Sequence, residues 1–205
     1  EPSKGNGMEH INQSRASDLI VIAPASANFI AKVSQGIADD LLTNICLARN
    51  CPLLIAPSMN REMWGNPATK RNVSLITKDG IVISGPDNGE QACGEEGMGR
   101  LVNEKVLLLD IKKSLSAQLF KNKNILISCG GTVENIDDAR AITNLSSGKM
   151  GFSIAESAYA YGANVALVCG RTDEKPPLGI KSFYASNHKT MKQVILEKVK
   201  NNDIF

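Results

Sequence analysis

The densest group of side chains that could do chemistry is PSMNREMW, residues 57–64. Asn60 offers two donors and an acceptor, which suit a carboxylate without adding charge. Thioether sulfur packs well on aromatic rings, so Met59 and Met63 could lie against a planar ligand. The alternative is an ordinary helix start in which Trp64 packs on the core. Both interpretations are open from these residues alone.

Two residues that could move protons lie outside that stretch. His10, in EHINQSR, precedes the first apolar run at the end of a predicted short helix, and it is one of two histidines. Imidazole is the natural base near neutral pH. Cys93 lies in the glycine-rich loop 89–100, where a thiol could donate a proton or act as a nucleophile. The alternatives are a surface or core-packing histidine and an incidental exposed thiol.

Two turns of small residues precede predicted helices, at PASAN and at SSGKMG. Free N–H groups at a helix start favour an anion such as phosphate. The residues that could present them are Ala25, Ser26 and Ala27 at the first turn and Ser146, Ser147 and Gly148 at the second. The alternative at each turn is a plain capped helix. SSGKMG lacks the Walker spacing, and CGGT lacks the GxGxxG pattern of dinucleotide sites.

The elements that must position these turns alternate regularly. Continuous apolar runs predict strands covered on both faces, at 18–24, 52–57, 80–86, 124–131 and 164–170, with another strand at 180–186. Helical spacing predicts helices between them, and in one of these helices Leu41, Leu42, Ile45 and Ala48 share a face. Strand–helix repetition predicts parallel sheets. The predicted fold class is α/β, with two Rossmann-like doubly wound parallel-sheet domains, both incomplete in this chain.

Four polar clusters come at or just after the C-terminal ends of predicted strands: PASAN, PSMN, CGGT and CGRT. Ligands bind at that edge in open α/β sheets. The charged break LFKNKN, residues 119–124, is the predicted junction between a domain at 1–118 and a domain at 119–205.

Composition argues against several other classes. A net charge of +2 without a basic stripe does not suggest nucleic acid, and no apolar run is long enough to span a membrane. Five cysteines without a CxxC pair fit a reducing, cytoplasmic setting, with Cys46, Cys129 and Cys169 as core residues. No metal-ligand spacing is present. The chain starts without Met and stops in an apolar stretch, so we expect a fragment of a longer protein.

The motifs resemble a known family when they are taken in order. HINQSRASDLIVIAPASANFIAK, GIADDLL, APSMNREMW and QACGEEGMGR resemble phosphopantothenoylcysteine decarboxylases, which are flavin-containing cysteine decarboxylases. GGTVENIDDARAITNLSSGKMGFSIAE is similar to the start of phosphopantothenate–cysteine ligase. Together they resemble the bifunctional bacterial enzymes of coenzyme A biosynthesis, over nearly the whole chain.

The resemblance implies roles in the first half. His10 would be catalytic, Asn60 would hold the substrate carboxylate and Cys93 would donate a proton. FMN would supply the redox chemistry that makes loss of CO2 from phosphopantothenoylcysteine feasible. The other residues implied to contact the cofactor or the substrate are Ser26, Ala27, Asn28, Met59 and Met63.

The resemblance also implies a ligase that joins phosphopantothenate to cysteine with CTP and Mg2+. Asn144 would help to process an acyl-cytidylate, and the residues implied to touch phosphate groups are Arg140, Ser146, Ser147 and Gly148. Family members are homo-oligomers built on trimers. The family's first strand and a later ligase lysine lie outside this sequence, so we expect residues 1–205 alone to be weak or inactive.

Two other functions fit parts of the pattern. One is a stand-alone flavin decarboxylase of peptidyl cysteine, which leaves the ligase-like half unexplained. The other is a non-catalytic relative that keeps the fold as a regulatory binding protein. Such a relative could dispense with His10, Asn60 or Cys93, and all three are present.

Overall fold

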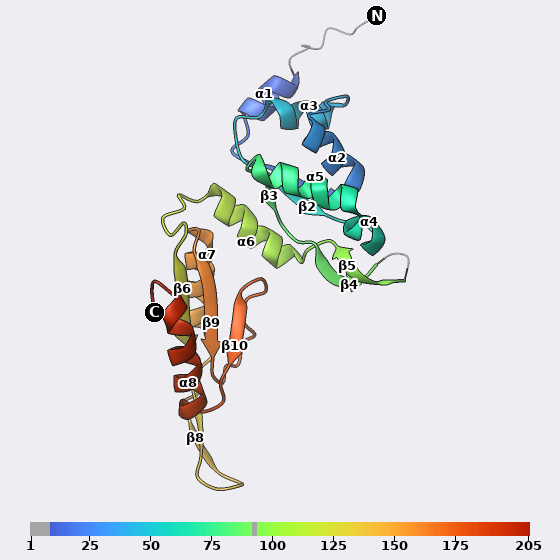
Figure 1. Ribbon diagram of the computed structural model, residues 1–205. Coiled ribbons are helices and arrows are strands. Elements are labelled where there is room, and N and C mark those ends of the chain that lie inside the picture. Colours follow the sequence, from blue (N-terminus) through green and yellow to red (C-terminus); the bar gives the residue numbers. More distant parts are fainter. Residues whose placement is uncertain (1–8, 92–93) are drawn as a thin grey trace, which may run out of the picture. The chain divides into compact units, whose positions relative to one another are not determined.

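The computed structural model describes residues 9–91 and 94–205, and the chain forms two compact units (Figure 1). Unit 1 ends at Leu115, and unit 2 is Ser116–Phe205, so the predicted junction lies a few residues further along. Unit 1 contains α1 (Glu9–Arg15), β1 (Ile20–Ala25), α2 (Ala27–Gln35), α3 (Leu41–Ala48), β2 (Leu53–Pro57), α4 (Arg61–Gly65), α5 (Pro67–Lys78), β3 (Val82–Ile83), β4 (Asp87–Glu90), β5 (Glu96–Arg100) and α6 (Glu104–Leu115). Unit 2 contains β6 (Asn124–Cys129), β7 (Val133–Asn135), β8 (Ala141–Thr143), α7 (Lys149–Ala160), β9 (Asn164–Cys169), β10 (Lys181–Tyr184), α8 (His188–Lys198) and a 3-10 turn (Val199–Asn201).

Unit 1 is built on a parallel sheet of order β1-β2-β3, in which Ile22 pairs with Ile55 and Ile55 with Ile83. Every residue of β2 is buried. Helices α2, α3 and α5 contribute Ile30, Cys46 and Ile76 to the core beside the sheet, and α6 also contacts β2. The continuous apolar run predicted a covered strand, and the structure has one.

Helix α3 buries a different face from the one that its apolar residues suggest. Leu41 and Leu42 are exposed, whereas Thr43 and Cys46 are buried. The capping box at Asp40 accounts for this, because its side chain accepts from the Thr43 N–H and so turns Thr43 inward at the helix start. The exposed leucines are therefore a correction to the expected core face.

The Asp40 cap makes the free energy of unfolding depend on pH in the acid range. Hydrogen bonds from the Thr43 N–H and hydroxyl, and then from Lys32, lower the pKa of Asp40 below its ordinary value of 3.8. A lowered folded pKa contributes stability that is present above the unfolded value and lost as pH falls through the folded value. The urea midpoint of wild type should therefore fall between neutral pH and pH ~3. In Asp40→Asn, which keeps an acceptor for the cap but has no carboxylate, we expect the midpoint to fall less over the same range. An unchanged slope in the variant would contradict this.

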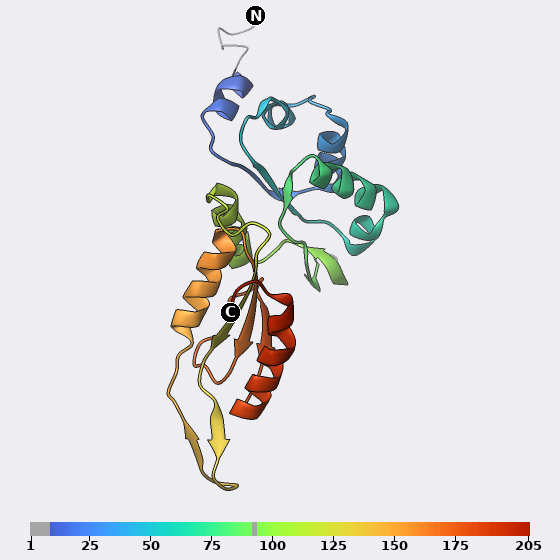
Figure 2. The same ribbon diagram turned by 60° about the vertical axis from the view of Figure 1, so that its left-hand side comes forward.

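Unit 2 has helices on both sides of a parallel sheet of order β10-β9-β6 (Figure 2). Phe152 of α7 packs with Leu167 and Cys169, whereas Met191 of α8 packs with Val168 on the other face of β9. This two-sided packing is the doubly wound arrangement. The predicted α/β class with parallel sheets is confirmed.

Cys129 and Cys169 end neighbouring strands as a registered pair, with their sulfur atoms 3.4 Å apart. Both are buried, and Cys46 is buried in unit 1. The thiol–thiol hydrogen bond and burial raise the pKa of Cys129, so its thiol stays neutral. The prediction that these cysteines are core residues is confirmed.

Two antiparallel hairpins were not expected. The glycine-rich segment 89–100 contains the end of β4 and all of β5, which pair Gly89 with Gly97, and β7 pairs with β8 through Glu134 and Ile142. Both pairs are short and polar, so they lack the apolar alternation by which strands are recognised. The expected loop at 89–100 is therefore wrong at residues 89–90 and 96–100, which lie in strands, whereas residues 91, 94 and 95 lie in neither a strand nor a helix.

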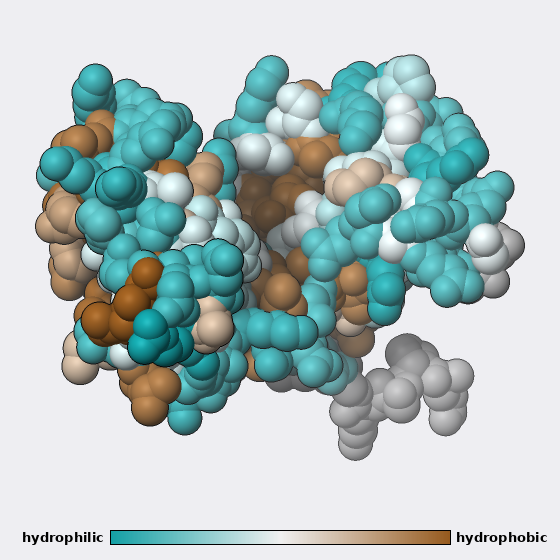
Figure 3. Space-filling view, turned by 90° about the horizontal axis from the view of Figure 1, so that it is seen from below, coloured by the Kyte–Doolittle hydropathy of each residue, from teal (hydrophilic) through white to brown (hydrophobic). Residues whose placement is uncertain are grey.

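Hydrophilic residues cover most of the face seen in Figure 3, with hydrophobic residues scattered among them. The exposed apolar side chains of unit 2 include Ile142, Leu145 and Met150. No helix in the described part of the chain is long and apolar enough to cross a membrane.

Gly151 allows α7 to lie close to β6, because a Cβ at this position would collide with the Cβ of Cys129. We expect Gly151→Ala to destabilise unit 2 by about 1–3 kcal/mol through overpacking, partly offset by the better helix propensity of alanine. Urea unfolding measures this. Ser153→Ala, at an exposed position of the same helix, is the matched control and should change the free energy of unfolding by less than about 0.5 kcal/mol. Equal stability of the two variants would contradict the close packing.

Candidate active site

The C-terminal ends of β1 and β2 bring PASAN and PSMN together. Ala25 pairs with Pro57, and the Ser58 N–H donates to the Ala25 carbonyl at 3.0 Å. Ser26 caps α2 by accepting the Phe29 N–H at 3.1 Å, so Ala27 and Asn28 form the first helical turn. Their backbone N–H groups have no partner within the helix, because a helix leaves its first N–H groups unpaired. The edge predicted for ligands is thus assembled from both clusters.

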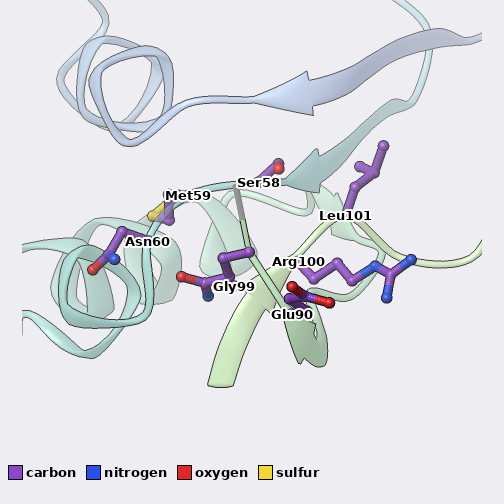
Figure 4. Close-up of a pocket in the computed structure, with 8 residues that line it drawn as sticks. Ser58, Met59, Asn60, Glu90, Gly99, Arg100 and Leu101 are labelled. Carbon is purple, nitrogen blue, oxygen red and sulfur yellow. The ribbon is translucent and has the colours of Figure 1, made fainter. Parts of the chain in front are cut away.

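A cavity of about 420 Å³ opens beside this edge (Figure 4). One wall is the connection from β2 to α4, and the other is the β4–β5 hairpin. Its lining residues are Ser58, Met59, Asn60, Glu90, Gln91, Gly99, Arg100 and Leu101. Asn60 and Met59 therefore lie where the sequence predicts a pocket.

The Asn60 side chain is held in one orientation by hydrogen bonds at both ends. Its Oδ1 caps α4 by accepting the Glu62 N–H at 2.8 Å. Its Nδ2 donates to Glu95 Oε2 at 2.8 Å. Because a flipped amide would place a donor against the Glu62 N–H, the network fixes which end of the amide faces the hairpin.

The hairpin is attached to the same segment by further hydrogen bonds. The Met59 N–H donates to the Gly99 carbonyl at 2.9 Å, and the Arg61 N–H donates to Gln91 Oε1 at 3.0 Å. Sequence reasoning did not identify Gln91 or Glu95. Their polar side chains in a glycine-rich stretch look like ordinary surface residues, and only the fold brings them to Asn60.

The other predicted residues of unit 1 lie elsewhere. His10 is in the first turn of α1, not at the end of a helix as expected, and among the described residues it does not line the cavity. Met63 is exposed on α4, whereas Trp64 is buried with Lys70 Nζ 4.2 Å from its ring centroid. Cys93 lies outside the described residues.

In unit 2 the turns after β6, β8 and β9 meet at one edge. Gly131 and Arg171 exchange two backbone hydrogen bonds, of 2.9 and 2.6 Å. A Cβ on Gly131 would lie 2.8 Å from the Asn144 carbonyl oxygen, and one on Gly148 would lie 2.7 Å from Thr172 Cγ2. Glycine is therefore required for this close approach. The predicted CGGT, CGRT and SSGKMG turns lie together.

The start of α7 lacks a side-chain cap, unlike the starts of α2, α3, α4, α5 and α8. Gly148 is its N-cap, with φ +83° and no side-chain cap, and the Lys149 N–H reaches Ser147 Oγ only at 3.4 Å. Ser146 precedes this turn and donates its N–H to the Asn144 carbonyl at 2.9 Å. A role for these residues in binding phosphate stays a prediction.

Arg140 lies in the connection between β7 and β8 rather than in the SSGKMG turn. Its Nε donates to Asp137 Oδ2 at 2.7 Å, and this pair lowers the pKa of Asp137. A contact between Arg140 and phosphate therefore requires a ligand that reaches the hairpin.

A second polar pair that the sequence did not suggest ties this hairpin to α8. Glu134 accepts from the His188 N–H at 2.8 Å and lies 2.6 Å from His188 Nδ1. These hydrogen bonds lower the pKa of Glu134, which keeps it charged. The pair fixes β7, at the base of the hairpin, to the start of α8, which follows β10 in the chain.

Comparison with known proteins finds a family match in each half of the chain. The family Flavoprotein matches residues 2–116, and the DNA/pantothenate metabolism flavoprotein C-terminal domain matches residues 120–205. A solved PPC decarboxylase mutant complexed with pantothenoylaminoethenethiol is similar with a TM-score of 0.51 and 34% identity, over 54% of this chain and 64% of that chain.

Curated relatives match along the whole chain. The coenzyme A biosynthesis bifunctional protein CoaBC of Vibrio parahaemolyticus is 38% identical over 205 residues, which are 100% of this chain and 51% of the relative. The protein of the same name from Escherichia coli is 37% identical over 206 residues, again 100% of this chain and 51% of the relative. The chain therefore spans about half the length of the curated relatives that it matches.

The predicted resemblance to bifunctional coenzyme A biosynthesis proteins is thus confirmed in both halves. The Flavoprotein match alone covers more than half of the 205 residues. The chain belongs to the flavoprotein family, and its second half carries the C-terminal domain of the DNA/pantothenate metabolism flavoproteins.

Proposed function

We propose that the full-length protein decarboxylates phosphopantothenoylcysteine with the help of FMN. The observation that carries this proposal is the Asn60 amide, whose orientation is fixed by the Glu62 N–H at the mouth of a cavity of about 420 Å³. A neutral amide donor can bind a carboxylate without the strong attraction of a cation, and so allows the carboxylate to leave as CO2.

The residues at the edge of unit 1 fit a flavin cofactor. The uncapped N–H groups of Ala27 and Asn28, beside Ser26, suit a phosphate, and Met59 offers a thioether for contact with a planar ring. When bound, FMN supplies the redox chemistry that the side chains lack. The chain itself supplies the binding groups, with Asn60 for the carboxylate and Met63 on the helix that follows.

Proton transfer is the remaining role. We assign a proton-moving role to His10 and proton donation to Cys93, both on the resemblance of their motifs. His10 lies on α1, which is fixed to α3 by the hydrogen bond from Ser14 Oγ to the Ala48 carbonyl at 3.2 Å. An assembly of several subunits, built on trimers, belongs to the same proposal, as does a cytoplasmic location.

We also propose that the full-length protein joins phosphopantothenate to cysteine at the expense of CTP, with Mg2+ offsetting the charge of the triphosphate. The convergence of three glycine turns at one sheet edge supports this, because close backbone approach suits phosphate. Asn144 is assigned to the activated carboxylate. The residues assigned to phosphate are Arg140, Ser146, Ser147 and Gly148.

The test uses the full-length protein. It should purify with the yellow absorbance of FMN and release CO2 from phosphopantothenoylcysteine, and Cys93→Ser should slow formation of the final product, phosphopantetheine. A protein that holds FMN and releases no CO2 would refute the decarboxylase. For the ligase, pyrophosphate should appear with CTP and phosphopantothenate, as the acyl-cytidylate forms, and CMP should appear only when cysteine is added as well; no release of either would refute that activity.

A further inference from the structure

The amide proposed to bind the substrate carboxylate already binds a carboxylate of the chain itself. Asn60 Nδ2 donates to Glu95 Oε2 at 2.8 Å, and the same oxygen lies 3.9 Å from Arg61 Nε. Arg61 Nε is closer to Glu62, at 3.0 Å. Arg61 is therefore shared between two carboxylates and only partly offsets the charge of Glu95.

A ligand carboxylate that approaches the Asn60 amide meets the Glu95 carboxylate, which already occupies it. The Asn60 Oδ1 is engaged by Glu62, so only the Nδ2 end can receive an anion. Two carboxylates at this one amide would repel each other, and the incoming one must displace Glu95 or bind beside a like charge. A ligand without a carboxylate meets no such competition.

We propose that Glu95 is a specificity-determining residue, whose carboxylate competes with the substrate carboxylate for the Asn60 amide. The inference rests on the proposed decarboxylase function and deepens it. Glu95 then weakens binding of the carboxylated form of a ligand relative to the same molecule without that group. Once CO2 has left, Glu95 can return to Asn60, which favours release of the decarboxylated product.

The test separates this effect from a structural role of the hairpin. Two inert analogues, both without the thiol, differ only in the carboxylate. Phosphopantothenoylserine carries the carboxylate, and phosphopantothenoylethanolamine lacks it. Calorimetry on the full-length, FMN-loaded protein measures their dissociation constants. We expect Glu95→Ala to lower the dissociation constant of the serine analogue by about threefold to tenfold, which is the range for removing one partly exposed charged competitor. The dissociation constant of the ethanolamine analogue should change by less than about twofold.

Two further variants sharpen the result. Glu95→Gln keeps an acceptor for Asn60 but loses the charge, so it should lie between wild type and Glu95→Ala. Glu96→Ala removes the same charge at the next residue, the first of β5, and should leave both dissociation constants unchanged. These two results together would assign the effect to the charge at residue 95.

Three outcomes would overturn the inference. Glu95→Ala could shift both analogues equally, which would give Glu95 only the task of holding the hairpin. It could shift neither. It could weaken the serine analogue alone, so that Glu95 helps to hold the carboxylate and does not compete with it. The proposed function fails separately, when wild type holds FMN and releases no CO2, so the two failures are distinguishable.

Discussion

Asn60→Asp should lower the rate of CO2 release by about 100-fold while leaving the fold intact. The two side chains have the same shape, and an aspartate oxygen can still accept the Glu62 N–H that caps α4. What is lost is the Nδ2 donor, which lies 2.8 Å from Glu95 Oε2; a negatively charged oxygen takes its place and would repel both Glu95 and the ligand carboxylate. CO2 release by the full-length protein and its urea midpoint measure the two effects.

Asn66→Asp is the matched control. Asn66 is the N-cap of α5 and accepts the Ala68 N–H at 2.9 Å, in the same way that Asn60 accepts the Glu62 N–H. It does not line the described cavity. Its substitution should therefore leave CO2 release within about twofold of wild type, with a similar change in stability. Equal loss of activity in both variants would mean that Asn60 acts only through its helix.

The strands, and the meeting of the PASAN and PSMN clusters at one sheet edge, could be predicted from the sequence because each has a local cause. The run PLLIAP is apolar at every position, and only a strand covered on both faces accommodates that pattern, as β2 does. Parallel strands place their carboxyl ends at one edge, so the meeting of Ala25 with Ser58 followed from connectivity alone.

The other half of the cavity could not be predicted because its causes are non-local. Strands β4 and β5 consist of polar residues and glycines, and they are held by pairing with each other and by the bond from Met59 to Gly99. Glu95 acquires its partner across 35 residues of sequence. Helix α3 shows the same limit, since its cap at Asp40, and not the leucines, determines the buried face.

Gly99 is the point at which the hairpin meets the segment that carries Asn60. Its φ is +139°, a conformation that residues with a side chain rarely adopt, and its carbonyl accepts the Met59 N–H at 2.9 Å. A Cβ there would collide with the Met59 carbonyl oxygen and would lie 2.9 Å from Gln91 Nε2. The first obstacle is backbone and cannot rotate away.

Gly99→Ala should therefore separate the hairpin from the β2–α4 connection and remove Glu95 from Asn60. We expect a loss of about 1–3 kcal/mol in the free energy of unfolding from the backbone conformation, and a fall in CO2 release of at least about tenfold because the cavity loses a wall. Urea unfolding and the CO2 assay on the full-length protein measure both. Gly65→Ala is the control, since a Cβ at Gly65 meets no atom within 4 Å and its φ lies outside the range from +20° to +160° that residues with a side chain rarely adopt. If Gly99→Ala keeps wild-type CO2 release, the hairpin is not a wall of the active site, and the cavity beside Asn60 does not hold the substrate.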